Sequence, residues 1–201
     1  MIKRVFDVSV SGGIILILSP VLLTISLIVR LTSGGPILFR HQRVGRLGQT
    51  FHCLKFRTMV ADAEGWLERD ESLRARHRDL GYKLPVDQDP RITAFGKFLR
   101  RSQLDELPQL FNVVLGHMSL VGPRPVVAEE LSNFTREQQD EMLSVRPGIF
   151  GPWTVLGRDR PNYPERAAIE CRYVGASSFV GDLSLLLRHV PVLLLGQRDD
   201  L

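Results

Sequence analysis

The sequence predicts a helix-rich α+β fold in which an N-terminal membrane segment (residues 1–34) precedes one small cytosolic domain (residues 35–201) that stays close to the membrane. Three observations lead to this prediction. An uncharged apolar run lies near the N-terminus, two strand-like runs follow it, and apolar residues recur at helical spacing after Leu104. A chain of 201 residues fits one domain, which buries roughly 70% of the surface that the unfolded chain exposes.

The apolar run extends from Val8 to Val29 without a charged residue. As one helix it would be about 33 Å long, which matches the roughly 30 Å hydrocarbon core of a bilayer. Pro20 lies near its middle and is expected to bend the helix, because proline lacks an amide hydrogen and clashes with the preceding turn. Ser19 can donate a hydrogen bond to a carbonyl freed by that break.

Basic residues flank the run on both sides: Lys3, Arg4, Arg30, Arg40, Arg43 and Arg46. Because cytoplasmic flanks attract Lys and Arg, this pattern suggests that both ends face the cytoplasm. Two legs of about 15 Å each, residues 8–18 and 21–29, would then reach the middle of the bilayer and return. From the residues alone, a re-entrant hairpin and a plain spanning helix both stay open. Asp7 and the lack of a small-x-small cleavage site argue against a signal peptide.

The predicted cytosolic domain contains several recognisable segments. Residues Ile37–Arg43 and Thr50–Phe56 are typical of a β-hairpin, with glycines in the connection. Residues 62–80 are charge-rich and predict a solvated helix or a surface excursion. Residues Asp182–Leu195 form an apolar segment of helical length interrupted by Pro191, which is either a helix in the membrane interface or an ordinary core helix.

The composition restricts the chemistry. A net charge of +4 suits anionic partners such as phosphates and lipid headgroups. Scattered charge and few aromatic residues argue against nucleic acid as a partner. Cys53 and Cys171 lack metal-ligand or Cys-x-x-Cys spacing, so we expect two reduced, buried thiols and no zinc site.

The stretch from Leu99 to Phe111 is the most informative for chemistry. Pro108 is expected in the first turn of a helix, where amides have no carbonyl partner, and this places Asp105 at or near the N-cap and Glu106 in the first turn. Both residue types suit a helix start on structural grounds alone. The competing interpretation is a carboxylate nucleophile beside a phosphate site, with a neighbouring carboxylate as base.

Such a site needs cations to neutralise phosphate, and the chain supplies Lys55, Arg57, Arg100, Arg101, Arg124 and Arg158. Pro123 and Pro125 flank Arg124 and predict a stiff loop that aims its side chain. Guanidinium groups bind phosphate bidentately, so an aimed arginine is a good clamp. Each of these residues taken singly is better explained as a solvated surface charge, and only their joint presence supports a phosphate site.

The sequence resembles the bacterial sugar transferase family, the monotopic polyprenyl-phosphate phosphoglycosyl transferases. The motifs that carry the resemblance run along nearly the whole chain: Lys3-Arg4-Val5-Phe6-Asp7, Ser19-Pro20, Gly35-Pro36-Ile37, Arg43-Val44-Gly45-Arg46, Lys55-Phe56-Arg57-Thr58-Met59, Leu104-Asp105-Glu106-Leu107-Pro108-Gln109-Leu110, Met118-Ser119-Leu120-Val121-Gly122-Pro123-Arg124-Pro125 and Arg146-Pro147-Gly148.

This resemblance implies a re-entrant membrane helix broken at Ser19-Pro20, a UDP-sugar donor, a polyprenyl phosphate such as undecaprenyl phosphate as acceptor, Mg²⁺ as cofactor and release of UMP. The enzyme would lie in the bacterial inner membrane, with its catalytic domain on the cytoplasmic face. Asp105 would be the nucleophile and contact the metal, and Glu106 would assist proton transfer. The residues implied to line the phosphate site are Lys55, Arg100, Arg124 and Arg158.

The chain departs from the family pattern at Phe150, Thr154 and Leu156, which makes donor recognition less certain than the chemistry. The stretches Gly81-Tyr82-Lys83-Leu84 and Asp89-Pro90-Arg91 resemble members that transfer hexose-1-phosphate, so UDP-galactose or UDP-glucose is the expected donor. Two alternatives stay open: a glycosyl transferase that releases UDP, and a membrane-bound nucleotide-sugar binding or scaffold protein. The sugar, the pathway and any homo-oligomer are left undecided by the sequence.

Overall fold

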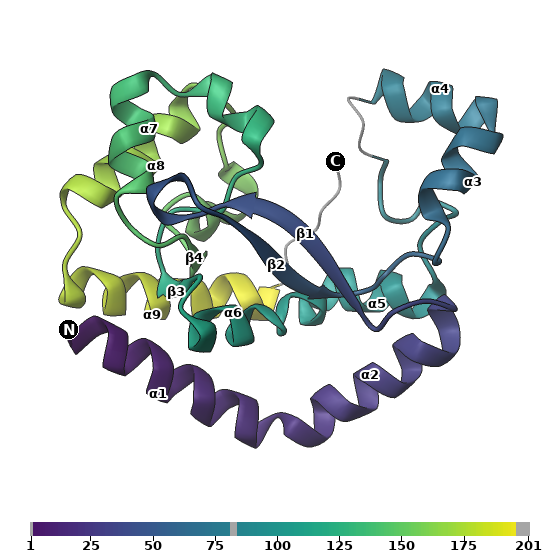
Figure 1. The fold of residues 1–201 in the computed structure, drawn as a ribbon, viewed down its shortest axis with the longest axis horizontal. Coiled ribbons are helices and arrows are strands. Elements are labelled where there is room, and N and C mark those ends of the chain that lie inside the picture. The colour runs from purple at the N-terminus through teal and green to yellow at the C-terminus, as the bar shows by residue number, and fades with distance from the viewer. Residues whose placement is uncertain (1, 81–83, 196–201) are drawn as a thin grey trace.

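The computed structural model describes residues 2–80 and 84–195, apart from the side chains of residue 158 and residues 192–195. Figure 1 shows a bent helix pair, α1 (Ile2–Ile17) and α2 (Ser19–Ser33), lying beneath a mixed body of helices and two short sheets. The prediction of a helix-rich α+β fold is therefore confirmed. The Gly81-Tyr82-Lys83 part of the hexose-type motif lies outside the described residues.

The break between α1 and α2 confirms the predicted bend at Pro20. The two helices meet at an angle of 66°. Pro20 has no N–H for the carbonyl of Leu16, and the hydroxyl of Ser19 donates to that oxygen instead, at 2.8 Å. Within the described residues no single helix is long and apolar enough to cross a bilayer, whereas α1 and α2 together have the length and composition to do so.

Polar residues at the start of α1 fasten the bent pair to the body. The carboxylate of Asp7 is buried and accepts a hydrogen bond from the Ser119 hydroxyl at 2.7 Å. Lys3 pairs with Asp182, and Arg4 donates to two carbonyl oxygens near the end of α6. The basic residues before the apolar run thus bind the folded domain.

The predicted β-hairpin is present, shifted by one residue in its first strand. Strands β1 (Leu38–Val44) and β2 (Thr50–Phe56) pair antiparallel, with Leu38 opposite Phe56 and Val44 opposite Thr50. A short 3₁₀ turn, η1 (Arg46–Gly48), connects them. The sequence did not predict the second sheet, in which β3 (Ser119–Val121) pairs parallel with β4 (Gly148–Phe150).

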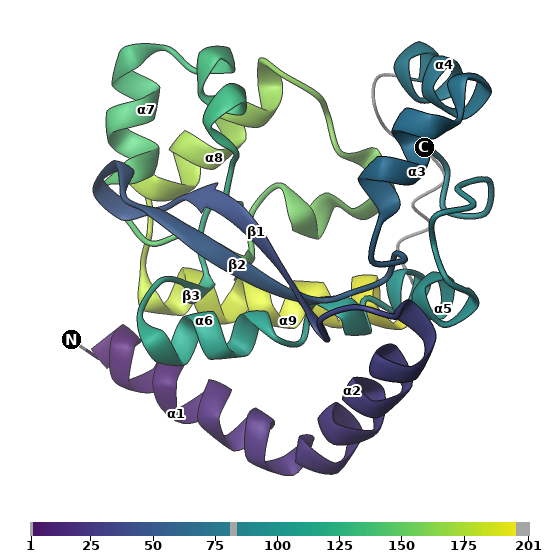
Figure 2. The ribbon, with the colours of Figure 1, turned by 45° about the vertical axis from the view of Figure 1, so that its right-hand side comes forward.

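The charge-rich segment predicted over residues 62–80 forms two helices, α3 (Ala63–Arg69) and α4 (Glu71–Asp79). The carboxylate of Asp70 caps α4 by accepting from the Leu73 amide at 2.9 Å. Figures 1 and 2 show this pair standing apart from α7 and α8. The other elements are α5 (Ala94–Ser102), η2 (Leu104–Glu106), α6 (Gln109–Leu115), η3 (Ala128–Asn133), α7 (Arg136–Leu143), η4 (Thr154–Asp159), α8 (Glu165–Gly175) and α9 (Phe179–Leu195).

Three apolar clusters hold these elements together. One joins α1 to β2, α6 and β3 around Val113 and Met118. A second packs α2 against Phe56 and Leu99. The third lies between the far end of the β-hairpin and α7 and α8, around Met142. Both helices of the bent pair therefore contribute to the core that positions α5 and α6.

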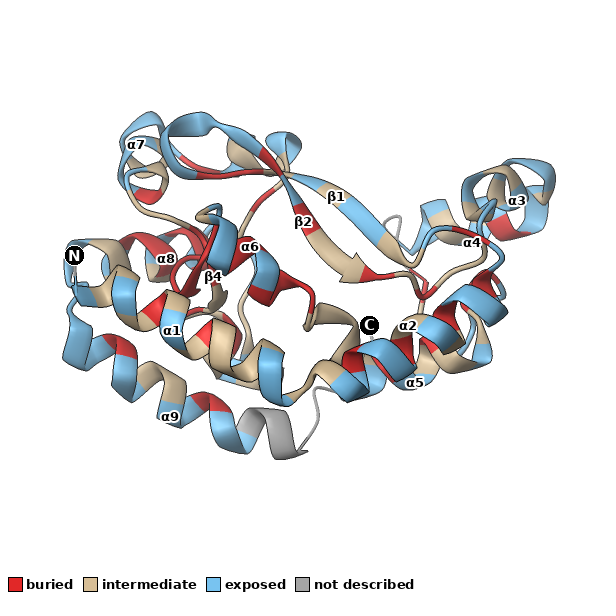
Figure 3. Ribbon diagram, turned by 60° about the horizontal axis from the view of Figure 1, so that its bottom comes forward, coloured by how far each residue is buried: buried red, intermediate tan, exposed pale blue. Residues whose placement is uncertain are grey.

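Helix α9 shows features of both alternatives left open by the sequence. Leu185 and Leu186 pack against the core. Asp182 and His189 are buried as well, whereas Val180 and Leu187 are 77% and 66% exposed. Figure 3 shows α1, α2, α5 and α9 side by side on one side of the protein. Exposed apolar residues occur on all four helices, including Leu23 on α2 and Phe98 on α5.

Candidate functional site

Asp105 and Glu106 lie on a tight turn between α5 and α6. Helix α5 ends at Ser102, Gln103 adopts a left-handed conformation with φ 58°, and Leu104–Glu106 form the 3₁₀ turn η2. The predicted N-cap position of Asp105 is wrong, because Pro108 is the N-cap and α6 begins at Gln109. The amides of Glu106 and Leu107 donate to the carbonyl oxygens three residues earlier in the chain, at 3.1 and 3.3 Å. These bonds close a separate turn before the helix.

The predicted apolar face of α6 needs a second correction. Leu110 and Val113 are buried, but Phe111 and Leu115 are 40% and 65% exposed. The polar residues Gln109 and Asn112 are buried as well. Asn112 bonds the edge of β2, donating to the His52 carbonyl at 2.7 Å and accepting from the Leu54 amide at 2.9 Å. These bonds hold α6, and the turn before it, beside the β-hairpin.

Lys55 on β2 brings a positive charge to this turn. Its Nζ lies 2.5 Å from Oε1 of Glu106, in an ion pair that joins residues 51 positions apart. Burial opposes ionisation of Glu106, but Lys55 and Arg124 together hold its pKa below the usual range. Glu106 is therefore a carboxylate at neutral pH.

Asp105 has the opposite electrostatic character. The pKa of Asp105 is raised to about 6, chiefly by burial and also by the negative charge of Glu106, while Lys55 and Arg100 act against this rise. Asp105 precedes α6 and does not cap it. At pH 7 Asp105 is mostly ionised yet poorly solvated, which favours its use as a nucleophile.

Arg100 approaches Asp105 from the last turn of α5. Its Nε donates to the Thr58 hydroxyl at 2.9 Å. Gly96 allows this approach, because a Cβ at that position would overlap the carbonyl oxygen of Thr58. Thr93 caps α5 by accepting from the Gly96 amide at 2.9 Å. The contact between α5 and the segment after β2 thus places Arg100 where its charge acts on Asp105.

Arg124 lies on the loop after β3, between the two prolines. Its backbone amide donates to Oε1 of the buried Glu170 on α8 at 3.3 Å, and its guanidinium lies 5.8 Å from the ring centroid of Trp153. Its charge acts on Glu106. The charges of Lys55, Arg100 and Arg124 therefore all act on the Asp105-Glu106 turn. Arg158 lies in η4, and its side chain is outside the described part of the structure.

Sequence analysis missed the group of residues that packs around the contacts of Arg124 with Glu170 and Trp153. The guanidinium of Arg166 lies 4.5 Å from the Trp153 centroid and 4.8 Å from that of Tyr163, and it pairs with Glu130 at 3.3 Å. Burial raises the pKa of Glu170 to about 7. Arg166 and Glu170 are four residues apart on α8, so both lie on one face of the helix. A pair of opposite charges at this spacing was the sequence signal that could have pointed to this group.

Two of the departures from the family pattern have a packing role. The hydroxyl of Thr154 bonds the amide of Gly151 at 2.8 Å and Nε2 of His189 at 3.0 Å. The ring of Phe150 contacts the same histidine, with centroids 5.1 Å apart. Both residues therefore fix α9 against the loop after β4, while Leu156 is 39% exposed.

The described residues contain no group of three or more His, Cys, Asp or Glu side chains that could hold a metal alone. Mg²⁺ usually takes one or two protein carboxylates and completes its shell with water and substrate phosphates, so the donors that could hold it here are the carboxylates of Asp105 and Glu106. Glu106 is already paired with Lys55, so Asp105 is the carboxylate suited to contact the ion. Cys53 and Cys171 are free and buried, as predicted.

Comparison with known proteins shows the family of the chain. The chain matches the family described as "Bacterial sugar transferase" over residues 1–196. It is 42% identical over 197 residues to an uncharacterized sugar transferase of Haemophilus influenzae. It is 41% identical over 197 residues to the undecaprenyl-phosphate galactose phosphotransferase of Salmonella typhimurium, and 38% identical over 196 residues to the exopolysaccharide production protein ExoY of Sinorhizobium fredii.

These matches cover 96%, 96% and 97% of this chain. The chain spans 41% and 40% of the first two relatives, and 86% of ExoY. The protein belongs to the bacterial sugar transferase family, which confirms the resemblance drawn from its motifs. It is accordingly an enzyme of the transferase class.

Proposed function

We propose that the enzyme transfers a sugar-1-phosphate from a UDP-sugar to a polyprenyl phosphate and releases UMP. The observation that carries this proposal is the pairing of a poorly solvated Asp105 with an ion-paired Glu106, next to Lys55, Arg100 and Arg124. The relatives named above include a galactose phosphotransferase that uses undecaprenyl phosphate, which supports a hexose as the sugar.

In the first half-reaction, a carboxylate oxygen of Asp105 attacks the sugar-linked phosphorus of the donor. The bond from this phosphorus to the bridging oxygen breaks, and UMP leaves with the electron pair. Lys55, Arg100 and Arg124 offset the charge of the pyrophosphate. Bound Mg²⁺ would supply further charge neutralisation at the same phosphates.

In the second half-reaction, a phosphate oxygen of the lipid attacks the phosphorus of the acyl phosphate. The Asp105 carboxylate is the leaving group, and the product is a polyprenyl diphosphate-sugar. Glu106 is ionised and can accept a proton if the acceptor arrives as a monoanion. Lys55 holds Glu106 in place during both steps.

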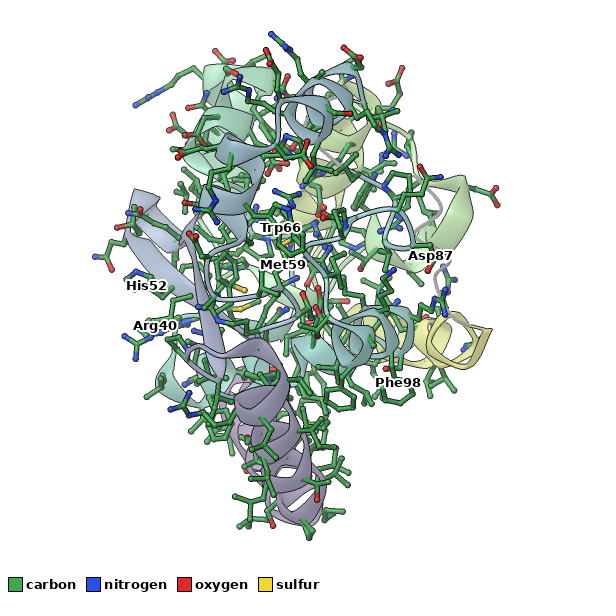
Figure 4. The ribbon with its side chains drawn as sticks, turned by 90° about the vertical axis from the view of Figure 1, so that its right-hand side faces the viewer. Arg40, His52, Met59, Trp66, Asp87 and Phe98 are labelled. Atoms are coloured by element: carbon green, nitrogen blue, oxygen red, sulfur yellow. The ribbon has the colours of Figure 1, made fainter. Side chains whose placement is uncertain are left out.

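The bent helix pair suits a re-entrant membrane hairpin. Its two ends pack on the same domain, and its middle carries the exposed residues Leu16 and Ile17, at 76% and 78%. Figure 4 shows the pair projecting from the body with mostly carbon side chains, whereas charged side-chain tips gather at the opposite end. We place this pair in the bacterial inner membrane with the exposed faces of α6 and α9 at its cytoplasmic interface.

The test is the donor half-reaction without lipid. Purified enzyme given UDP-galactose or UDP-glucose and Mg²⁺ should release a burst of UMP, at most one per active site, and gain a hexose-phosphate mass on the peptide that contains Asp105. Asp105→Asn should abolish both signals. Release of UDP would indicate a glycosyl transferase instead, and binding without release would indicate a scaffold. UMP release only after addition of lipid, with no adduct on rapid quenching, would show that transfer is direct.

A further inference from the structure

The loop that carries Arg124 has two backbone torsions left for its surroundings to fix. The proline rings set φ of Pro123 and Pro125, and Pro125 restricts ψ of the residue before it. The remaining torsions next to Arg124 are ψ of Pro123 and φ of Arg124, and they flank a single peptide unit. The contacts of this peptide unit therefore set the direction in which the Arg124 side chain leaves the backbone.

Both ends of this peptide unit are hydrogen-bonded. The Pro123 carbonyl accepts from the amide of Gly148, the first residue of β4, at 2.8 Å. The Arg124 amide is the one backbone donor of residues 123–125, because proline has none, and it donates to Oε1 of Glu170 at 3.3 Å. Loss of the Glu170 carboxyl would leave this peptide unit held at its carbonyl end only.

Glu170 accepts no other hydrogen bond within the described part of the chain. It is 1% exposed, and its Oε2 is buried there without a hydrogen-bond partner. Burying a carboxyl costs free energy unless it is well hydrogen-bonded, so an apolar residue would serve packing alone at least as well. The structural effect of this carboxyl therefore falls on the loop of Arg124.

Helix α8 gives Glu170 a fixed support. Arg166, one turn earlier, pairs with Glu130 at 3.3 Å, and its guanidinium lies 4.5 Å from the ring centroid of Trp153. The same indole faces the Arg124 guanidinium at 5.8 Å. Figure 2 shows α8 with α7 beside the turn end of the β-hairpin, where the third apolar cluster lies. One face of α8 thus acts on Arg124 twice, through its backbone amide and through the ring beside its side chain.

We propose that Glu170 is a positioning residue for the transfer reaction. Its carboxyl holds the amide of Arg124, and this contact keeps the guanidinium directed at the pyrophosphate of the donor. Glu170 acts through Arg124 and is not itself a catalytic residue. This inference rests on the proposed function and adds a residue on which the phosphate clamp depends.

Two substitutions separate the hydrogen-bond acceptor of Glu170 from its charge and size. Glu170→Gln keeps an oxygen that can accept from the Arg124 amide, whereas Glu170→Leu is apolar and has no acceptor. Met142→Ala is the matched control for lost stability. Met142 is 3% exposed and belongs to the same apolar cluster as Ala167 of α8, but its side chain makes no hydrogen bond to the loop in the described structure.

The measurement is single-turnover release of UMP from saturating UDP-galactose or UDP-glucose, by full-length enzyme in detergent micelles with Mg²⁺ and without lipid. The burst amplitude counts folded enzyme, and the rate constant reports the action of Arg124. Glu170→Leu should lower the rate constant by about tenfold, the effect of one lost hydrogen bond to a buried amide. Glu170→Gln should stay close to the unmodified enzyme, and Met142→Ala should lower only the amplitude.

A second measurement tests whether the effect passes through Arg124. In an Arg124→Met background, Glu170→Leu should change the rate constant by less than about twofold, because the clamp that it positions is already gone. If Glu170→Leu does not fold and gives no burst, Glu170→Ser takes its place, since this side chain is too short to reach the amide.

An unchanged rate constant in Glu170→Leu, or in Glu170→Ser where that variant replaces it, would overturn the proposal. So would a loss in Glu170→Gln as large as that in Glu170→Leu, an equal fall of the rate constant in Met142→Ala, or losses from Arg124→Met and Glu170→Leu that multiply in the double variant. In each of these cases the unmodified enzyme still gives its burst, and the proposed function stands. Absence of the burst in the unmodified enzyme would instead refute the proposed function itself.

Discussion

The pH dependence of UMP release tests the environment of Asp105 directly. An attacking carboxylate must be ionised, and burial raises the pKa of Asp105 to about 6. The rate should therefore fall as the pH drops through about 6, instead of through the usual range near 4. For one group with this pKa, about nine tenths of the carboxyl is ionised at pH 7 and about one tenth at pH 5, so we expect about a tenfold loss.

Two variants should shift the acidic limb of the pH–rate profile, where the rate falls with decreasing pH, in opposite directions. Lys55→Met removes a charge that lowers the pKa of Asp105, so the limb should move to higher pH. Glu106→Gln removes a charge that raises it, so the limb should move to lower pH. The assay is quenched single-turnover release of UMP from UDP-sugar without lipid, with Lys55→Arg as the charge-preserving control. An acidic limb near pH 4, or one that moves the same way in both variants, would refute the assignment of Asp105 as the nucleophile.

Three further predictions concern the phosphate clamp, the membrane hairpin and the stability of the domain. Arg124→Lys should lower UMP release by about tenfold or more, because lysine keeps the charge but loses the planar fork; an unimpaired variant would show that only charge acts there. Single cysteines at the two ends of the hairpin, in a background without Cys53 and Cys171, should both be shielded from an impermeant thiol reagent in intact cells. Pro20→Leu should expose the N-terminal one, whereas labelling of that position before the substitution would establish a spanning helix. Asp89→Ala should lower the free energy of unfolding by about 3 kcal/mol, since it leaves Arg91 buried and unpaired. Denaturant titration measures this loss, and the control Asp87→Ala, in an exposed ion pair, should lose less than about 1 kcal/mol.

The Asp89–Arg91 pair also has a defined pH dependence. Burial opposes ionisation of Asp89, but the hydrogen bonds and charge of Arg91 lower its pKa below the usual value. A lowered carboxyl pKa stabilises the fold above the unfolded-state value, and this stabilisation is lost as pH falls through the lowered one. The difference in unfolding free energy between the unmodified protein and Asp89→Ala should therefore shrink in acid. A constant difference would contradict the ion pair as its cause.

Local rules account for what could be predicted about the fold. Pro20 breaks the apolar helix because it lacks an amide hydrogen, and the partner of the freed carbonyl, Ser19, is its neighbour in sequence. The β-hairpin follows from two alternating runs around a short connection. The parallel pairing of β3 with β4 joins segments roughly 25 to 30 residues apart. Local sequence patterns do not predict a pairing at this separation.

The family and the candidate carboxylates Asp105 and Glu106 were also evident from the sequence, because the motifs that carry them are contiguous. Their electrostatics were not. The position of Asp105 before the helix, and not at its N-cap, depends on the left-handed turn at Gln103. Burial then raises the pKa of Asp105, where a helix terminus would have lowered it.

The sequence by itself determined the bend in the apolar N-terminal segment, the β-hairpin, the transferase family and the adjacent carboxylates Asp105 and Glu106. Only the tertiary structure decided which charges meet, because Lys55 and Glu106 lie 51 positions apart. It also decided that α9 turns its polar residues inward, where Asp182 meets Lys3. The physical reason is range: backbone constraints act over a few residues, whereas burial and Coulomb interactions depend on groups that approach one another only when the chain has folded.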